Sequence, residues 1–111
     1  MLEKLRVAKE AALDKKAKDV ILFDLQGHSD TTDFHFVCSG ESERQTKAIV
    51  EEITFQLKTQ YQILPRQVEG KETAQWVSLD YGAFIVHVFL DSIRHYYAIE
   101  GLWEQHQAEF E

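Results

Sequence analysis

The sequence predicts an α/β (α+β) domain, a single mixed β-sheet of about five strands with flanking helices in the order α-β-β-α-β-β-β-α. Segments with helical spacing of apolar residues alternate with short runs rich in β-branched and aromatic residues, which are typical of strands. One long helix separates two of these runs, whereas short turns join others, so parallel and antiparallel neighbours are expected in one sheet. The 111 residues contain no repeat or linker, so residues 1–111 form one domain.

The first half of the chain predicts two helices with two strands between them. Residues 2–18 carry a narrow apolar stripe and consist mainly of Ala, Leu, Lys and Glu, which favour helices. Asp19–Leu25 and Asp33–Ser39 are apolar runs bounded by charged or turn residues, so each predicts a strand. A Ser followed three residues later by Gln forms a capping box at the start of the clearest amphipathic helix, residues 42–61.

The second half is denser in strands. Residues 63–68 include a proline, so we expect an edge strand there. A further strand runs from Trp76 to Leu79, and the following Tyr81-Gly82 pair predicts a tight hairpin turn. The most apolar run, residues 83–90, predicts a central strand, and residues 93–106 look helical in pieces interrupted by a glycine.

Composition and charge exclude several classes of function. Twelve Lys and Arg against 19 Asp and Glu give a net charge of −7, which argues against nucleic acid as the main partner and favours a basic protein. The single Cys excludes an internal disulfide framework and suits a reducing compartment. The sequence shows neither the apolar core of a signal peptide nor the ~20-residue apolar run of a membrane span. We therefore expect a cytoplasmic protein with no membrane contact.

Four acidic residues are candidates for a divalent metal site. Asp19 and Asp24 lie near one predicted strand, and Asp30 and Asp33 flank the next. Paired carboxylates can hold Mg²⁺ for phosphoryl or nucleotidyl transfer. A nucleotidyl-transfer site normally has a Gly-Ser turn followed by two alternating acids on one strand, and that pattern is missing. These residues therefore predict strand ends and turns.

A second candidate is the H-x-D-x-x-D-x-H stretch from His28 to His35, whose side chains are suitable ligands for Zn²⁺. It spans a junction between loop and strand, so the side chains need not converge. Cys38 could act as a nucleophile with a His, but its apolar strand predicts a buried, inert thiol. We expect no catalytic residues, no bound metal and no cofactor.

Trp76, Asp80, Tyr81 and His87 form the candidate partner-binding site. If residues 81–82 make the hairpin turn, Trp76 and His87 lie roughly opposite one another on neighbouring strands. Aromatic residues beside a carboxylate are typical of the energetic centre of a protein–protein interface. Two alternatives stay open: Trp76 could fill the core, and His87 could be a buried, hydrogen-bonded histidine.

Four groups of residues follow one another from about Ala8 to Trp103. They are Lys15-Lys16-Ala17 with the strand ending in Asp24; Thr32-Asp33-Phe34 and Ser39-Gly40 with Ser42, Arg44 and Gln45; Glu69-Gly70 with Trp76-Val77 and Leu79-Asp80-Tyr81-Gly82; and Val86-His87-Val88-Phe89 with Arg94, Tyr97, Glu100, Leu102 and Trp103. This ordered combination resembles the ribosomal silencing factor family, also called RsfS or Iojap. Departures are small: Phe34 and His35 replace a more usual Tyr-Phe pair, and Ile99 stands where Leu is common.

The resemblance implies a protein that is not an enzyme. It implies binding to the large ribosomal subunit through ribosomal protein L-fourteen, which blocks joining of the small subunit and lowers translation when nutrients are scarce. It also implies a nucleotidyltransferase-like fold without the active site, and little direct contact with nucleic acid. The alternatives are a degenerate nucleotidyltransferase-like enzyme and a purely structural dimer domain, so a homodimer stays open.

Overall fold

The structure is a computed structural model that describes residues 2–27, 32–97, 104–108 and 110. The helices and strands, in chain order, are α1 (Leu2–Asp14), β1 (Lys18–Asp24), β2 (Phe34–Gly40), α2 (Glu43–Tyr61), β3 (Gln67–Glu69), β4 (Trp76–Asp80), β5 (Phe84–Leu90), α3 (Asp91–Tyr97), the 3₁₀ helix η1 (Glu104–His106) and β6 (Gln107–Ala108).

The strands form one mixed sheet of six strands in the order β3-β4-β5-β2-β1-β6. The central strands β2 and β5 pair in parallel, and the other neighbours pair antiparallel. The predicted fold class and the central position of the 83–90 run are confirmed. The sheet has one strand more than the expected five, because the two-residue β6 pairs with Leu22 and Phe23. Two residues are too few to show strand periodicity in a sequence.

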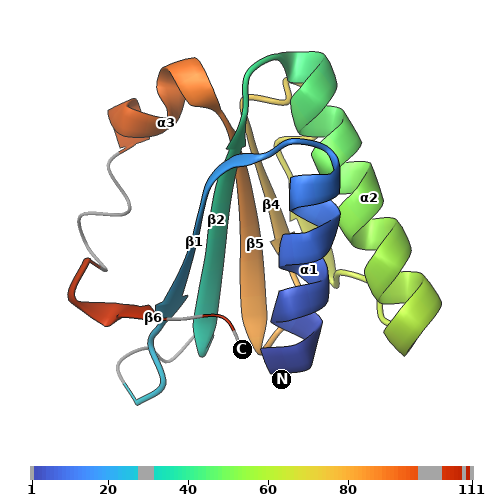
Figure 1. Cartoon of the computed structure of the whole chain (residues 1–111), viewed down its shortest axis with the longest axis vertical. Helices are drawn as coiled ribbons and strands as arrows, with labels where there is room; N and C mark the ends of the chain where they lie inside the picture. The colour runs from blue at the N-terminus through green and yellow to red at the C-terminus, as the bar shows by residue number, and fades with distance from the viewer. Residues whose placement is uncertain (1, 28–31, 98–103, 109, 111) are drawn as a thin grey trace.

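Helices α1 and α2 lie side by side over one face of the sheet (Figure 1). We call this the helix-covered face. Side chains alternate along each strand, so every second residue of β2 and β5 points toward these helices. The main apolar core forms here, from Leu5, Ala8 and Ala12 of α1, Ile49, Ile53 and Leu57 of α2, Phe34, Phe36 and Cys38 of β2, and Phe84, Val86 and Val88 of β5.

The remaining side chains of the strands point to the other side, which we call the opposite face. A smaller apolar cluster lies there, built from Phe23, Val37 and Phe89 with Trp76 packed against it. Helix α3 follows β5 on the side away from α1 and α2 (Figure 1). From α3, the buried Arg94 donates a hydrogen bond of 2.6 Å from Nη1 to Oγ of Ser39 at the end of β2.

Two predicted boundaries differ from the structure. The first helix ends at Asp14 rather than residue 18, because Lys16 takes a positive φ of 64° and the Ala17 N–H bonds back to the Ala12 carbonyl. This is a Schellman ending that has Lys where Gly is usual. The edge strand is confined to Gln67–Glu69 instead of residues 63–68. The final helical region is α3 and η1, and residues 98–103 between them lie outside the described part.

Candidate partner-binding surface

The candidate residues separate into two pairs at opposite ends of β4. Trp76 opens the strand and is directly opposite Phe89, whereas His87 is opposite Ser78. Trp76 and His87, expected roughly opposite one another, are offset by two residues along the paired strands. Because they are diagonal neighbours on the same face, their side chains still meet.

A chain of hydrogen bonds links Trp76, His87 and His35 on the opposite face. Trp76 Nε1 lies 3.1 Å from His87 Nδ1, and His87 Nε2 lies 2.9 Å from His35 Nδ1. An indole N–H can only donate, so His87 Nδ1 accepts and its Nε2–H donates to His35. The geometry thereby fixes the tautomer of both imidazoles. The two histidine rings also stack, with centroids 5.1 Å apart.

Burial keeps both histidines neutral. Desolvation, with a smaller contribution from the neighbouring His35, lowers the pKa of His87 from 6.5 to about 3. Desolvation lowers the pKa of His35 to about 4. His87 is only 6% exposed and His35 only 7% exposed. This supports the alternative of a hydrogen-bonded core histidine at position 87, and it makes His87 a support for Trp76 rather than a surface contact.

Trp76 is the partly exposed member of this chain. Its ring stacks on Phe89 with centroids 5.0 Å apart and an interplanar angle of 24°. The hydrogen bond to His87 at the indole nitrogen and the stack on Phe89 together fix the orientation of the ring. A fixed aromatic side chain at the edge of a sheet can anchor a protein partner with little loss of side-chain entropy.

Asp80 and Tyr81 lie at the other end of β4, in the hairpin. Asp80 Oδ1 accepts a hydrogen bond of 2.8 Å from the Gly82 N–H and lies 3.3 Å from Nε of Arg66. Gly82 has a φ of 90° and belongs to a tight turn, as predicted. The Tyr81 N–H donates to the Phe84 carbonyl, so the turn residues are Gly82-Ala83 and not the expected residues 81–82. Asp80 therefore holds the turn together and is already paired with a surface arginine.

Tyr81 belongs to the helix-covered face instead. Its ring stacks on Phe84 at 4.9 Å between centroids and packs against the main core. Among the described residues its buried hydroxyl has no hydrogen-bond partner, and burial raises its pKa to about 12. The candidate residues are therefore divided between the two faces of the sheet, because alternation along β4 sends Tyr81 to the face away from Trp76.

The residues considered for chemistry are dispersed in the described part of the chain. Within residues 2–27, 32–97 and 104–108, no cluster of three His, Cys, Asp or Glu side chains has the geometry to hold a metal ion. His28 and Asp30 lie outside the described residues, so the predicted His28–His35 stretch is seen only in its second half. Cys38 is fully buried on the helix-covered face, and desolvation raises its pKa to about 12. Its thiol is therefore protonated and inert near neutral pH.

Sequence reasoning missed the part that His35 plays beside His87. The alternation of Phe34, His35 and Phe36 already places the imidazole on the face away from the two phenylalanines. What no sequence pattern supplies is the parallel register of β2 and β5, which puts Val37 opposite His87 and brings the two imidazoles together.

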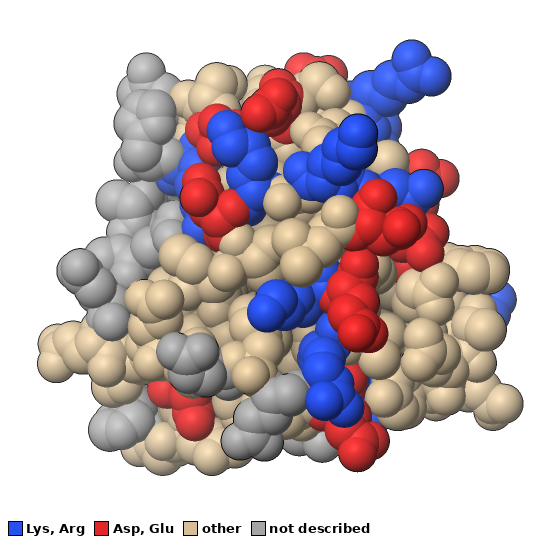
Figure 2. All heavy atoms as spheres, viewed as in Figure 1, with Lys and Arg blue, Asp and Glu red and all other residues tan. Residues whose placement is uncertain are grey.

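The surface of the helix-covered side carries Lys and Arg side chains interspersed with Asp and Glu, as Figure 2 shows. That mixture differs from the continuous basic patch typical of nucleic-acid binding. No helix in the described part is long and apolar enough to cross a membrane.

Comparisons with known proteins agree with this fold over nearly the whole chain. Residues 1–111 match the family model described as "Ribosomal silencing factor during starvation". The ribosomal silencing factor RsfS of Halalkalibacterium halodurans is 40% identical over 101 residues, which cover 91% of this chain and 86% of that protein. The RsfS of Bacillus subtilis is 38% identical over 99 residues, covering 89% of this chain and 83% of that protein.

Solved structures agree with the sequence matches. A crystal structure from Chromobacterium violaceum superposes with a TM-score of 0.87 and 35% identity, covering 97% of this chain and 89% of that one. A more distant mouse relative, 28% identical over 94 residues and matched over 40% of its length, is named "Mitochondrial assembly of ribosomal large subunit protein 1". The two bacterial RsfS proteins and the mouse relative are named for ribosome-related roles and not as enzymes. The chain belongs to the ribosomal silencing factor family, RsfS.

Proposed function

We propose that this protein is a ribosomal silencing factor that binds the large ribosomal subunit through ribosomal protein L-fourteen and blocks joining of the small subunit. The observation that carries the proposal is the family match over residues 1–111. The mouse relative, whose name refers to the large ribosomal subunit, supports the choice of that subunit. Repression of translation under nutrient limitation, in the cytoplasm, follows from the same resemblance.

The proposed mechanism is steric and requires no reaction. A small domain held on the joining surface of one subunit excludes the other, so binding energy alone produces the effect. Three of the groups with shifted pKa values, those of His35, Cys38 and His87, are buried and uncharged near neutral pH, as structural side chains are. No cofactor is needed for a steric block.

The proposed contact centres on Trp76. The hydrogen bond to His87 and the stack on Phe89 present the free edge of the indole in one orientation. A basic ribosomal protein also suits the chain's net charge of −7. Asp80, with its side chain 23% exposed, offers a second contact through its carboxylate. Tyr81 contributes the exposed part of its ring on the other side of the hairpin, and His87 acts by holding Trp76.

Sedimentation of separated ribosomal subunits with the purified protein tests the proposal. We expect the protein to travel with large subunits and to reduce the whole-ribosome peak when small subunits are added. The proposal fails if a saturating amount of protein leaves subunit joining undiminished.

Binding of variants to isolated ribosomal protein L-fourteen then locates the contact. Trp76→Ala should weaken binding by more than about tenfold, since truncation of an aromatic anchor costs ~2 kcal/mol or more. Asp80→Asn is the milder probe, because the amide oxygen can still accept from Gly82. A thermal melt of each variant separates loss of contact from loss of fold. Variants that melt normally and bind like the parent would move the contact to another surface.

A further inference from the structure

Three polar side chains form a row across the opposite face, from strand β4 to the centre of the sheet. Trp76 lies on β4, His87 on β5 and His35 on β2, and these are consecutive strands of the sheet. Strand β4 is bordered by the three-residue edge strand β3, whereas β2 pairs with β5 along all seven of its residues and also with β1. The row therefore connects a partly exposed indole near the edge of the sheet to a strand at its centre.

The position of the proton on His87 decides whether the indole has an acceptor. A neutral imidazole has one donor nitrogen and one acceptor nitrogen. Because the Trp76 indole N–H donates to Nδ1 of His87 over 3.1 Å, the proton of His87 must be on Nε2. That N–H in turn donates to Nδ1 of His35 over 2.9 Å. His35 thus supplies the acceptor for the one tautomer of His87 that can bind the indole.

Burial makes the acceptor at position 35 important. The His87 side chain is buried, and a buried N–H that loses its hydrogen bond is unfavourable. Moving the proton to Nδ1 would not relieve this loss, because the His87 N–H would then point at the indole N–H of Trp76. Loss of the acceptor at position 35 therefore weakens the support of Trp76, although the two residues lie on different strands.

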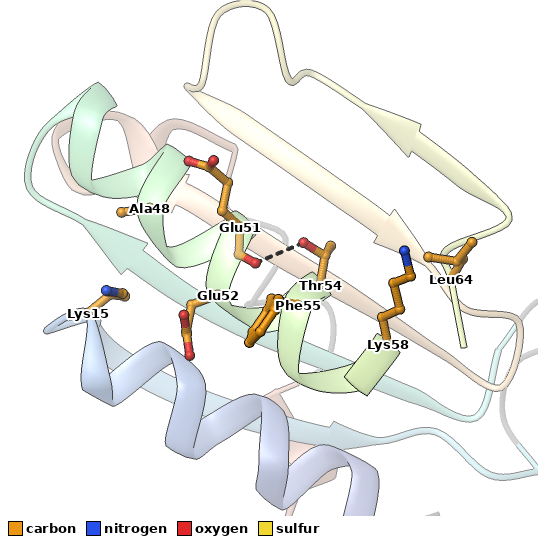
Figure 3. A pocket seen from close by; sticks show the side chains of 8 residues that line it. All are labelled: Lys15, Ala48, Glu51, Glu52, Thr54, Phe55, Lys58 and Leu64. Atoms are coloured by element: carbon orange, nitrogen blue, oxygen red, sulfur yellow. Dashed lines mark hydrogen bonds between the residues drawn. The ribbon is translucent and has the colours of Figure 1, made fainter. Parts of the chain in front are cut away.

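The exposed aromatic residue of α2 provides a contrast. Phe55 lies in a shallow groove of about 730 Å³ on the outward side of the helix, with 59% of its surface exposed (Figure 3). The hydroxyl of the neighbouring Thr54 bonds the carbonyl oxygens of Val50 and Glu51 within the helix, at 2.9 and 3.0 Å. A phenyl ring has no polar atom, so no hydrogen bond fixes its orientation. The indole of Trp76, by comparison, is held from within the sheet.

We propose that His35 is a positioning residue for the partner contact of Trp76: it accepts from Nε2 of His87, so that Nδ1 of His87 holds the indole in its binding orientation. A ring that is fixed before binding loses little side-chain entropy in the complex. Because the indole N–H is bonded inward, a partner meets carbon atoms of the ring rather than a hydrogen-bond donor. This inference rests on the proposed function, which places Trp76 at the contact with ribosomal protein L-fourteen.

Nuclear magnetic resonance of the parent protein gives the first test. Nitrogen chemical shifts identify the protonated nitrogen of each imidazole, and we expect His87 to carry its proton on Nε2. The indole N–H of Trp76 should exchange slowly with solvent, because it is bonded to a buried ring. The chain has two tryptophans, so Trp76→Phe removes one of two indole signals and assigns it. A proton on Nδ1 of His87 would overturn the inference without any change at position 35.

His35→Phe is the most direct variant, because it keeps an aromatic ring that can stack on His87 but offers no acceptor. Exchange of the Trp76 indole N–H should become about tenfold faster. Binding to isolated ribosomal protein L-fourteen should weaken by about three- to tenfold, since the indole must now be ordered on binding. His35→Asn should restore both values to within about twofold of the parent, because the amide Oδ1 can accept where Nδ1 did.

Ser39→Ala is the matched control. It removes another buried hydrogen bond from the same face of β2, the one that Ser39 Oγ accepts from Arg94. This bond is not part of the row, so indole exchange and L-fourteen binding should equal those of the parent. A thermal melt of each variant sets a common temperature at which all of them are folded.

The outcomes separate this inference from the ribosomal proposal. A parent that does not bind L-fourteen would overturn the proposed function. A parent that binds, with a His35→Phe variant that binds as tightly or exchanges its indole proton as slowly, would overturn only the role of His35. The same conclusion follows if His35→Asn restores neither value or if Ser39→Ala has the same effect as His35→Phe. Either result would assign the loss to general damage to the sheet.

Discussion

On the helix-covered face, β2 and β5 contribute Phe36, Val86 and Val88; on the opposite face the same two strands contribute His35, His87 and Ser39. Both sets of side chains are buried. The first set is stabilised by apolar packing, whereas the second depends on hydrogen bonds whose donors and acceptors must match. Side chains of this sheet are therefore buried for two distinct physical reasons, so equal exposure does not mean equal tolerance of substitution.

The largest effect on stability should come from the helix-covered face, which apolar packing stabilises. Phe36→Ala removes a fully buried ring from a central strand and should lower the free energy of unfolding by about 3–5 kcal/mol. Phe55→Ala is the matched control, because the same truncation at an exposed helix site should change stability by less than about 0.5 kcal/mol. Urea denaturation of both variants measures the difference. Similar losses in the two variants would show that the helix-covered core is not where the stability resides.

A smaller loss of stability is expected when one hydrogen-bond donor is removed from the opposite face. Trp76→Phe keeps an aromatic ring over Phe89 but deprives His87 Nδ1 of its N–H donor. A buried acceptor left without a partner costs about 1–3 kcal/mol. Urea denaturation should show that loss with little change in the slope of the transition. An unchanged midpoint would mean that the hydrogen bond contributes nothing to stability.

Acid should destabilise the protein through the two buried histidines of the opposite face. The unfolded chain binds protons at histidine with a pKa near 6.5, whereas the folded values are about 4 for His35 and about 3 for His87. The unfolded state therefore binds more protons over this interval, so the free energy of unfolding falls as the pH drops from about 6.5 toward these folded values. The largest possible slope is about 1.4 kcal/mol per pH unit for each histidine.

Urea midpoints between pH 7.5 and 5 measure this loss above the range where most carboxylates titrate. The double variant His35→Gln/His87→Gln should be less stable at neutral pH but should show a flatter pH dependence. All other titratable groups are common to the two proteins, so the difference between the two profiles isolates positions 35 and 87. Parallel pH profiles would show that the two imidazoles are not the source of the acid sensitivity.

The smallest effect should come from the Tyr81 hydroxyl, a polar group on the otherwise apolar helix-covered face. Within the described residues the Tyr81 hydroxyl is buried without a hydrogen-bond partner, so Tyr81→Phe removes no favourable bond. We expect the variant to be as stable as the parent, within about 0.5 kcal/mol, or slightly more stable. A loss of stability as large as that of Trp76→Phe would reveal a hydrogen-bond partner for this hydroxyl. Both faces would then depend on hydrogen bonds.

Sequence patterns predicted the residues of the helix-covered face well, and the contacts on the opposite face only in part. The amphipathic stripe of α2 and the alternation in β2 identify which side chains face the helices, because local spacing determines these directions. The polar contacts depend instead on cross-strand register. The pairing of Val37 with His87 follows from how the chain returns through α2, β3 and β4, which local sequence does not specify. The Schellman ending at Lys16 was missed for a related reason, since tertiary context overrides the usual preference for glycine.

The parallel pairing of β2 with β5 has a consequence for how the chain folds. Their paired residues are about 50 positions apart, so the centre of the sheet closes only after α2, β3 and β4 have been traversed. The β4–β5 hairpin is local and should form early, whereas β2 must wait for β5. On a translating ribosome that adds about 5–20 residues each second, the apolar residues of β2 emerge several seconds before their partner strand. We therefore expect slow completion of the sheet and a period during synthesis when β2 is open to aggregation or to capture by a chaperone.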